Sequence, residues 1–177
     1  MLLRAFAATK PVARNHRLLM VGSGTERESL QQLARELGIE GACVWIPAPE
    51  NVVEWLRSMD VFVLCSETES FPNALLEAMA CGCAAMGSAV GGVPEMIEDG
   101  VNGLLFPAGD VAALARGLER LAAEPRERQA MGEAAARAAR DRFTQQINLQ
   151  RMTAIYEAII EKRDVPQLPA NYRLTPA

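Results

Sequence analysis

The chain has 177 residues, 50% of them hydrophobic and 23% charged, a composition typical of a globular domain with a sizeable core. Its formal net charge of −4 provides no basic face, so we do not expect nucleic acid as a partner. No apolar run approaches the roughly 18 residues of a membrane-spanning helix. The run Met1–Ala8 is too short for a signal peptide and is interrupted by Arg4. We expect a cytoplasmic protein of one domain, or one half of a larger enzyme.

Four cysteines, at positions 43, 65, 81 and 83, and the single histidine His16 limit the chemistry of the chain. No Cys-x-x-Cys pair occurs and there is one histidine, so the sequence does not supply the ligands of a zinc site or the residues of a Cys/His nucleophile pair. We expect no protein-bound metal and no covalently bound cofactor. The thiols are expected to be reduced and buried.

Apolar runs and the turn residues between them predict alternating strands and helices. The strands are expected at residues 17–21, 43–46, 61–65, 83–87 and 104–106. Three helices in succession follow from Asp110. This order predicts an α/β fold with a mostly parallel sheet flanked by helices, and additional helices at the carboxyl end. We assign residues 1–163 to this domain and residues 164–177, with three prolines and no periodicity, to an extended tail.

Several helix starts can be predicted from local patterns. Thr25 and Glu28 have the spacing of a capping box, and Asp110 and Thr144 are expected as N-caps of later helices. Pro72 is expected at the first helical position, where its missing N–H would have no partner anyway.

The first strand is followed by Gly22-Ser23-Gly24, which resembles the start of a dinucleotide-binding fingerprint. Arg27 stands where the third glycine would be, which disfavours a Rossmann dehydrogenase. Two interpretations of Gly22 and Gly24 remain open. They could form a tight turn that needs glycine geometry, or a turn whose backbone N–H groups face a phosphate.

The stretch Ser66–Gly82 is the one around which the chain is organised. Val61–Cys65 before it has the pattern of a strand buried on both faces. Ser66–Phe71 is then a loop at the carboxyl end of that strand, and a helix from Pro72 follows, ended by Gly82. Open α/β sheets bind their ligands at such a position.

Glu77 is surrounded in this helix by apolar residues, so we expect a buried carboxylate that needs a partner. The residues alone leave two interpretations open. Glu77 could form a salt bridge or hydrogen bond with a neighbouring loop, or it could accept hydrogen bonds from the hydroxyls of a ligand.

Four ordered motifs resemble the carboxyl-terminal domain of group 1 (family 4) retaining glycosyltransferases, over roughly residues 17–160. They are Glu69-x-Phe71-Pro72-Asn73, Glu77-Ala78-Met79-Ala80, Gly91-Gly92-x-Pro94-Glu95 and Asn102-Gly103-Leu104. Members of this family have two Rossmann-like domains that face each other across a cleft, the GT-B fold. The resemblance implies one half of such an enzyme, Rossmann-like and mostly parallel.

The resemblance also implies roles for individual residues. Glu69 would lie beside the donor sugar and phosphate, and Glu77 would bind the ribose hydroxyls. The backbone N–H groups of Asn73, Ala74 and Leu75, after Phe71 and Pro72, would bind the diphosphate of the nucleotide. A helix N-terminus is suited to an anion on physical grounds as well. The implied donor is a UDP- or GDP-linked sugar, used without a protein-bound metal.

Three features depart from the family pattern. The family begins this domain with one more strand, then a Gly-Arg loop and a lysine, whose cations stabilise the leaving diphosphate. The chain starts after that point, and neither Arg4 nor Lys10 stands in a matching motif. Ser70 replaces the usual glycine after Glu69, and Ala84-Ala85-Met86 replaces the common Pro-Val-Val.

We therefore expect the donor-binding half of a glycosyltransferase, with little transfer activity alone. Its partners would be a nucleotide sugar and an amino-terminal GT-B domain. A peripheral contact of that amino-terminal domain with a membrane remains an open possibility. One alternative is a non-catalytic nucleotide-sugar-binding or interaction module, favoured by an exposed apolar edge where the extra strand belongs. Another is a GT-B-fold epimerase. A phosphorylase is disfavoured, since neither Lys10 nor Lys162 lies in a pyridoxal phosphate motif.

Overall fold

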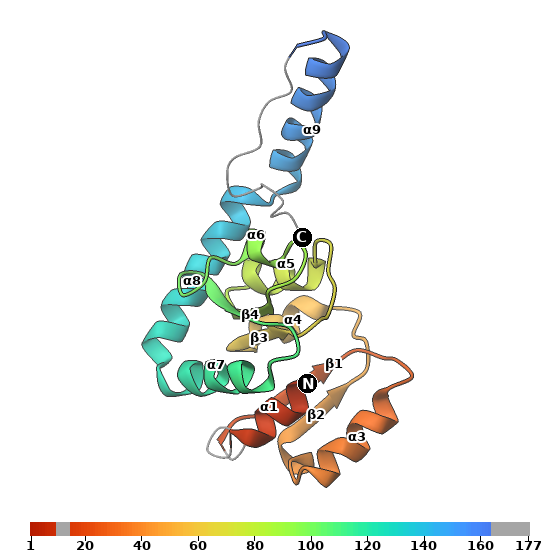
Figure 1. Ribbon diagram of the computed structural model, residues 1–177, viewed down its shortest axis with the longest axis vertical. Helices are drawn as coiled ribbons and strands as arrows, with labels where there is room; N and C mark the ends of the chain where they lie inside the picture. Colours follow the sequence, from red (N-terminus) through yellow and green to blue (C-terminus); the bar gives the residue numbers. More distant parts are fainter. Residues whose placement is uncertain (10–14, 164–177) are drawn as a thin grey trace.

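The computed structural model describes residues 1–9 and 15–163, so the predicted tail at 164–177 lies outside the described residues. Strands and helices alternate along the first two thirds of the chain, and three longer helices follow (Figure 1). The strands are β1 (Leu18–Val21), β2 (Cys43–Ile46), β3 (Val61–Leu64), β4 (Ala84–Ser88) and β5 (Gly103–Phe106). The helices are α1 (Leu2–Ala8), α3 (Arg27–Glu36), α4 (Val52–Arg57), α5 (Asn73–Ala80), α6 (Val93–Met96), α7 (Val111–Ala123), α8 (Pro125–Arg142) and α9 (Gln145–Ile160), with a 3₁₀ turn at Glu40–Ala42.

All the strand pairs are parallel, which confirms the predicted α/β class. β1 pairs with β2, from Leu18 opposite Cys43 to Val21 opposite Ile46. β4 lies between β3 and β5 in a separate three-stranded sheet. The structure therefore differs from the single mostly parallel sheet that we expected: in the described residues the sheet is divided between β1 and β3.

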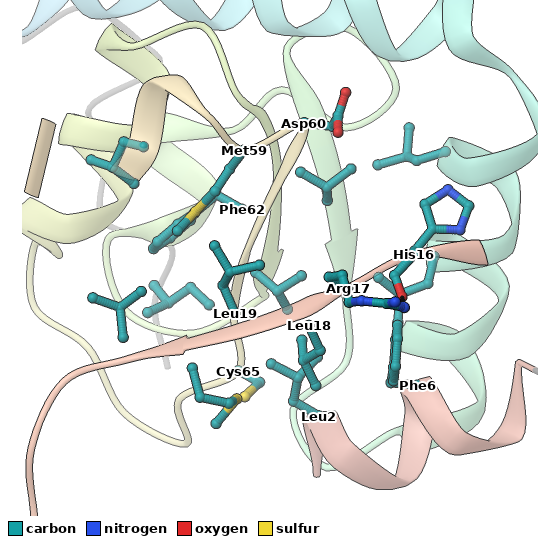
Figure 2. A pocket seen from close by; sticks show the side chains of 18 of the residues that line it. Leu2, Phe6, His16, Arg17, Leu18, Leu19, Met59, Asp60, Phe62 and Cys65 are labelled. Atoms are coloured by element: carbon teal, nitrogen blue, oxygen red, sulfur yellow. Dashed lines mark hydrogen bonds between the residues drawn. The ribbon is translucent and has the colours of Figure 1, made fainter. Parts of the chain in front are cut away.

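A cavity of about 730 Å³, which we call the inter-sheet slot, occupies this division. It is lined by the four residues of β1 and by residues 60–66 around β3. Side chains from α1, α4, α5 and α7 complete its walls (Figure 2). All four residues of β3 are only half-buried, so the predicted burial of this strand on both faces is wrong. The reason is that one edge of β3 borders the slot instead of another strand.

β4 forms the centre of the core, and all five of its residues are buried. Leu75 and Met79 of α5 pack with Ala135 and Ala139 of α8 in one apolar cluster. A second cluster joins β4 and β5 to α1 and α7. The small residues of α8 allow this close packing, since a Cβ on Gly132 would lie 2.2 Å from the Gly82 carbonyl oxygen.

The helix starts agree with the sequence in two cases and differ in two. The Asp110 carboxylate accepts from the Ala113 N–H at 2.8 Å, and the Thr144 hydroxyl accepts from the Ile147 N–H at 3.2 Å, as predicted. The predicted capping box at Thr25 is wrong, because α3 begins two residues later, at Arg27, with no side-chain cap. Pro72 is the N-cap residue of α5 and not its first helical residue.

Candidate functional site

The site loop, residues 66–72, connects the carboxyl end of β3 to α5, as the sequence predicted. Glu69 is half-buried there, and its Oε1 accepts a hydrogen bond from the Ser66 hydroxyl at 2.7 Å. The Ser66 carbonyl in turn accepts from the hydroxyl of Ser88, which is fully buried at the end of β4, at 2.6 Å. The Glu69 carboxylate is thus held in place through Ser66 of the site loop and Ser88 at the end of the neighbouring strand β4.

Gly91 and Gly92 pack directly against the site loop. The Gly92 N–H donates to the Ser70 carbonyl at 3.0 Å. A Cβ on Gly91 would lie 1.5 Å from the Glu69 carbonyl oxygen, and one on Gly92 would lie 2.2 Å from the Ser70 carbonyl oxygen. Gly91 also has φ +50°, a conformation that glycine adopts without strain. Only glycine fits at these two positions, and the motifs at 69–73 and 91–95 therefore form one unit.

Phe71 is connected to the carboxyl end of α8. Its ring lies 5.5 Å from that of Phe143, measured between centroids, at an interplanar angle of 59°. The Arg142 guanidinium lies 4.8 Å from the centroid of Phe143, and its Nη2 donates to the Glu95 carbonyl at 2.5 Å. Tilted aromatic pairs and cation–π contacts of this kind are each worth about 0.5–1.5 kcal/mol. These contacts connect the motifs at 69–73 and 91–95 to the carboxyl end of α8.

The amino end of α5 has no side-chain cap. Leu76 is the first residue of the helix whose N–H donates backward, to the Pro72 carbonyl at 3.2 Å. The N–H groups of Asn73, Ala74 and Leu75 precede it, at the positive end of the helix dipole. Asn73 and Ala74 are exposed, whereas Pro72 and Leu75 are buried and fix the start of the helix. This end of α5 presents backbone donors suited to an anion.

Glu77 lies one turn further along α5 and is exposed, so its predicted burial is wrong. The exposed residues of α5, at positions 73, 74, 77 and 80, follow helical spacing and form one face. Leu75, Ala78 and Met79 form the buried face instead. Ala74 and Glu77 both line the inter-sheet slot, and both residues are exposed.

The Gly22-Ser23-Gly24 turn follows β1 and is exposed. Gly22 has φ +138°, and its N–H donates to the Ile46 carbonyl at 2.9 Å, so the turn requires glycine geometry at this position. A Cβ on Gly24 would contact nothing within 4 Å. Gly24 is therefore not needed for packing within the described structure.

Neither a metal cluster nor a disulfide appears in residues 1–9 and 15–163. All four cysteines are free, but only Cys83 is fully buried, so the prediction of buried thiols is wrong for the other three. Burial raises the pKa of Cys83 to about 11, and the nearby Cys81 and Asp60 add to this effect.

The sequence did not predict Ser88, Arg142 and Phe143 as residues that support the site. Their partners are 22, 47 and 72 positions away, which no local pattern shows.

The model of the family described as "Glycosyl transferases group 1" matches residues 1–138. The chain belongs to this family. Among its relatives, N-acetyl-alpha-D-glucosaminyl L-malate synthase of Bacillus anthracis is 37% identical over 143 residues, which are 81% of this chain and 36% of that protein. D-inositol 3-phosphate glycosyltransferase of Thermomonospora curvata is 40% identical over 150 residues, 78% of this chain and 35% of that protein. The chain thus spans about a third of the length of these curated relatives.

Solved structures show the same fold at low sequence identity. Sucrose-phosphate synthase from Thermosynechococcus elongatus has a TM-score of 0.77 at 24% identity, covering 90% of this chain and 42% of that one. Anabaena HepE in complex with UDP has a TM-score of 0.76 at 23% identity, covering 85% and 44%. The carboxyl-terminal domain of the group 1 protein LpcC from Francisella tularensis has a TM-score of 0.74 at 22% identity, covering 82% and 78%. The fold is that of one half of a GT-B glycosyltransferase.

Within the part of the chain that the structure describes, no helix is long and apolar enough to cross a membrane.

Proposed function

We propose that this chain is the donor-binding half of a retaining group 1 glycosyltransferase and that it binds a nucleotide-diphosphate sugar at the site loop and α5. The observation that carries the proposal is the uncapped amino end of α5 beside Glu69, at the carboxyl end of a parallel strand. Backbone donors, a dipole end and a held carboxylate meet at the position where open α/β sheets bind ligands.

Each site residue has a separate task in this proposal. The N–H groups of Asn73, Ala74 and Leu75 bind the diphosphate, and Glu69 lies beside the donor sugar. Its hydrogen bond with Ser66 keeps the carboxylate near that position before the donor arrives. Glu77, exposed one turn along the helix, accepts hydrogen bonds from the ribose hydroxyls. In the exposed turn after β1, Gly24 offers its backbone N–H toward the phosphates, and Gly22 shapes the turn because its own N–H donates to the Ile46 carbonyl.

The complexes of structural neighbours support a nucleotide donor. HepE from Anabaena is described with UDP and with UDP-glucose, and the pneumococcal O-GlcNAc transferase GtfA with UDP and GlcNAc. For this chain the donor is a UDP- or GDP-linked sugar. In this proposal the acceptor site and any membrane contact belong to an amino-terminal GT-B domain. The cations that stabilise the leaving diphosphate belong to the Gly-Arg loop and lysine with which the family begins this domain. The 177-residue chain alone should therefore show little or no transfer, and robust turnover would contradict that part.

A thermal-shift titration with UDP, GDP and ADP tests the binding site. At about 100 times its dissociation constant, a bound nucleotide should stabilise the chain by roughly 2.7 kcal/mol. We expect a shift with UDP or GDP, and a smaller shift for Glu77→Ala because the ribose loses its acceptor. Glu119→Ala, which removes an exposed glutamate on α7 outside the site, is the matched control and should respond as the wild type does.

Two results would contradict the proposal. If no nucleotide stabilises the wild-type chain, the site loop and α5 do not form a donor site. If Glu77→Ala responds like Glu119→Ala, Glu77 does not bind the ribose, although the phosphate site at Asn73–Leu75 could still account for the wild-type shift.

A further inference from the structure

Three contacts fix the backbone of Ser70 in the middle of the site loop. The Ser70 carbonyl accepts a hydrogen bond from the Gly92 N–H at 3.0 Å. On the preceding side, the Glu69 carbonyl packs so closely against Gly91 that a Cβ there would lie 1.5 Å away. On the following side, the Phe71 ring packs against an aromatic ring at the carboxyl end of α8, 5.5 Å away between centroids. Because the peptide groups on both sides are held, the Cα–Cβ bond of Ser70 has a fixed direction.

The Ser70 hydroxyl is accessible to a ligand. Ser70 is exposed, whereas the carbonyls at 69 and 70 face the glycine pair, so its side chain lies where this pair leaves the loop open. Two nearby serine hydroxyls already donate within the protein: Ser66 to Glu69 at 2.7 Å, and Ser88 to the Ser66 carbonyl at 2.6 Å. No such bond joins the Ser70 hydroxyl to another of the described residues. It therefore keeps one donor and two acceptor sites for a bound molecule.

The position of this hydroxyl indicates which part of a donor it contacts. Ser70 directly follows Glu69, and the Cα atoms of consecutive residues are about 3.8 Å apart. It also precedes by three residues Asn73, where the free N–H groups of α5 begin. In the proposed donor complex the sugar lies beside Glu69 and the diphosphate lies at the amino end of α5. Ser70 is therefore placed on the sugar side of the diphosphate, where the groups to be bound are ring hydroxyls.

We propose that Ser70 is a specificity-determining residue of the donor site, and that its hydroxyl forms a hydrogen bond with a ring hydroxyl of the donor sugar. This inference rests on the proposed function, because it requires a nucleotide sugar at the site loop and α5. A hydroxyl held in one direction matches a sugar hydroxyl of one configuration and loses the bond with the epimer. A sugar nucleotide therefore binds more tightly than its nucleotide alone, and the difference depends on Ser70.

Calorimetric titration of the chain with UDP, UDP-glucose, UDP-galactose, GDP and GDP-mannose tests the inference. For each variant we compare the affinity for a sugar nucleotide with that for its nucleotide, a ratio that we call the sugar ratio. Ser70→Ala removes the hydroxyl, whereas Ser70→Thr keeps it. Thr153→Ala, which removes an exposed hydroxyl of α9 outside the site, is the matched control. Both positions are exposed, so all three variants should unfold at the wild-type urea midpoint.

We expect a sugar ratio above one in the wild type for at least one sugar nucleotide, and a ratio about three- to tenfold lower in Ser70→Ala, the worth of one hydrogen bond. Ser70→Thr and Thr153→Ala should keep the wild-type ratio. All three variants should bind UDP and GDP as the wild type does. UDP-glucose and UDP-galactose differ in configuration at one ring carbon, so a Ser70-dependent difference between them would identify the hydroxyl that is bound.

Four results would overturn the inference. A wild-type sugar ratio in Ser70→Ala would do so and leave the nucleotide site intact, as would a ratio lowered equally in Ser70→Thr. An equal loss of affinity of Ser70→Ala for the nucleotide alone would show that Ser70 acts on the phosphates or on the loop. If the wild type binds nucleotide but gains nothing from the sugar, Ser70 reads no sugar hydroxyl. If it binds neither, the proposed function fails as well.

Discussion

Gly91→Ala tests whether the contact between the site loop and the Gly91-Gly92 pair holds the site together. The new Cβ would lie 1.5 Å from the Glu69 carbonyl oxygen, whereas a close carbon–oxygen contact is about 3.4 Å. The Glu69 carbonyl would have to withdraw by about 2 Å. That movement would displace Glu69 from Ser66 and lengthen the hydrogen bond from the Gly92 N–H to the Ser70 carbonyl.

The expected cost has three contributions. Alanine at φ +50° costs about 1–2 kcal/mol, overpacking adds about 1–3 kcal/mol, and the weakened Gly92–Ser70 hydrogen bond adds about 0.5–1.5 kcal/mol. Gly91→Ala should therefore lower the free energy of unfolding by about 3–6 kcal/mol. Gly109→Ala is the matched control, with φ +81° and nothing within 4 Å of its Cβ, so only the backbone strain of about 1–2 kcal/mol applies.

Urea unfolding measures the difference between the two variants. With a slope of about 2 kcal/mol/M, Gly91→Ala should unfold at a urea concentration about 1–2 M below that of Gly109→Ala. Gly91→Ala should also lose the nucleotide-induced thermal shift, and Gly109→Ala should keep it. Equal unfolding midpoints for the two variants would refute the idea that the contact with Glu69 makes glycine necessary at position 91.

Three further predictions concern other parts of the fold. Ser88→Ala leaves the Ser66 carbonyl without its buried donor, and should cost about 1–3 kcal/mol in urea unfolding and weaken nucleotide binding. Asp110→Ala removes the cap of α7 and should cost about 0.5–2 kcal/mol without changing nucleotide binding. Burial raises the pKa of Cys83 from 9.0 to about 11, so its alkylation in the folded chain should stay slow until the pH approaches 11. Because the unfolded chain loses this thiol proton first, the free energy of unfolding should fall as the pH rises from about 9 to 11.

Each of these predictions can fail in a recognisable way. Ser88→Ala with full nucleotide binding would show that the two-serine connection does not position the site loop. Asp110→Ala should be compared with Thr144→Ala, which removes the cap of α9, and an unchanged unfolding midpoint for both would contradict the capping assignments. Cys83→Ala should remove most of the fall in stability between pH 9 and 11 and leave a smaller part due to Cys43, whose pKa burial also raises. An unchanged fall would show that another group is responsible.

Local patterns in the sequence determined the elements and predicted the place of the candidate site. The β-branched and apolar runs located the strands, and Asp110 and Thr144 were identified as caps because a cap bonds to an N–H three residues away. The order of strand, site loop and helix predicts a ligand site at residues 66–77, and the family match confirms the resemblance on which the glycosyltransferase assignment rests.

Only the tertiary structure decided how that site is held and which of its residues are accessible. Helix periodicity shows which residues share a face, but whether the face with Glu77 is buried or exposed depends on which elements pack against α5, and no stretch of sequence contains that information. The contact of Glu69 with Gly91, and that of Phe71 with Phe143, joins positions 22 and 72 residues apart. Such contacts form only when the chain packs. Local propensities fix the secondary structure of each segment, but burial of the core decides which segments come into contact.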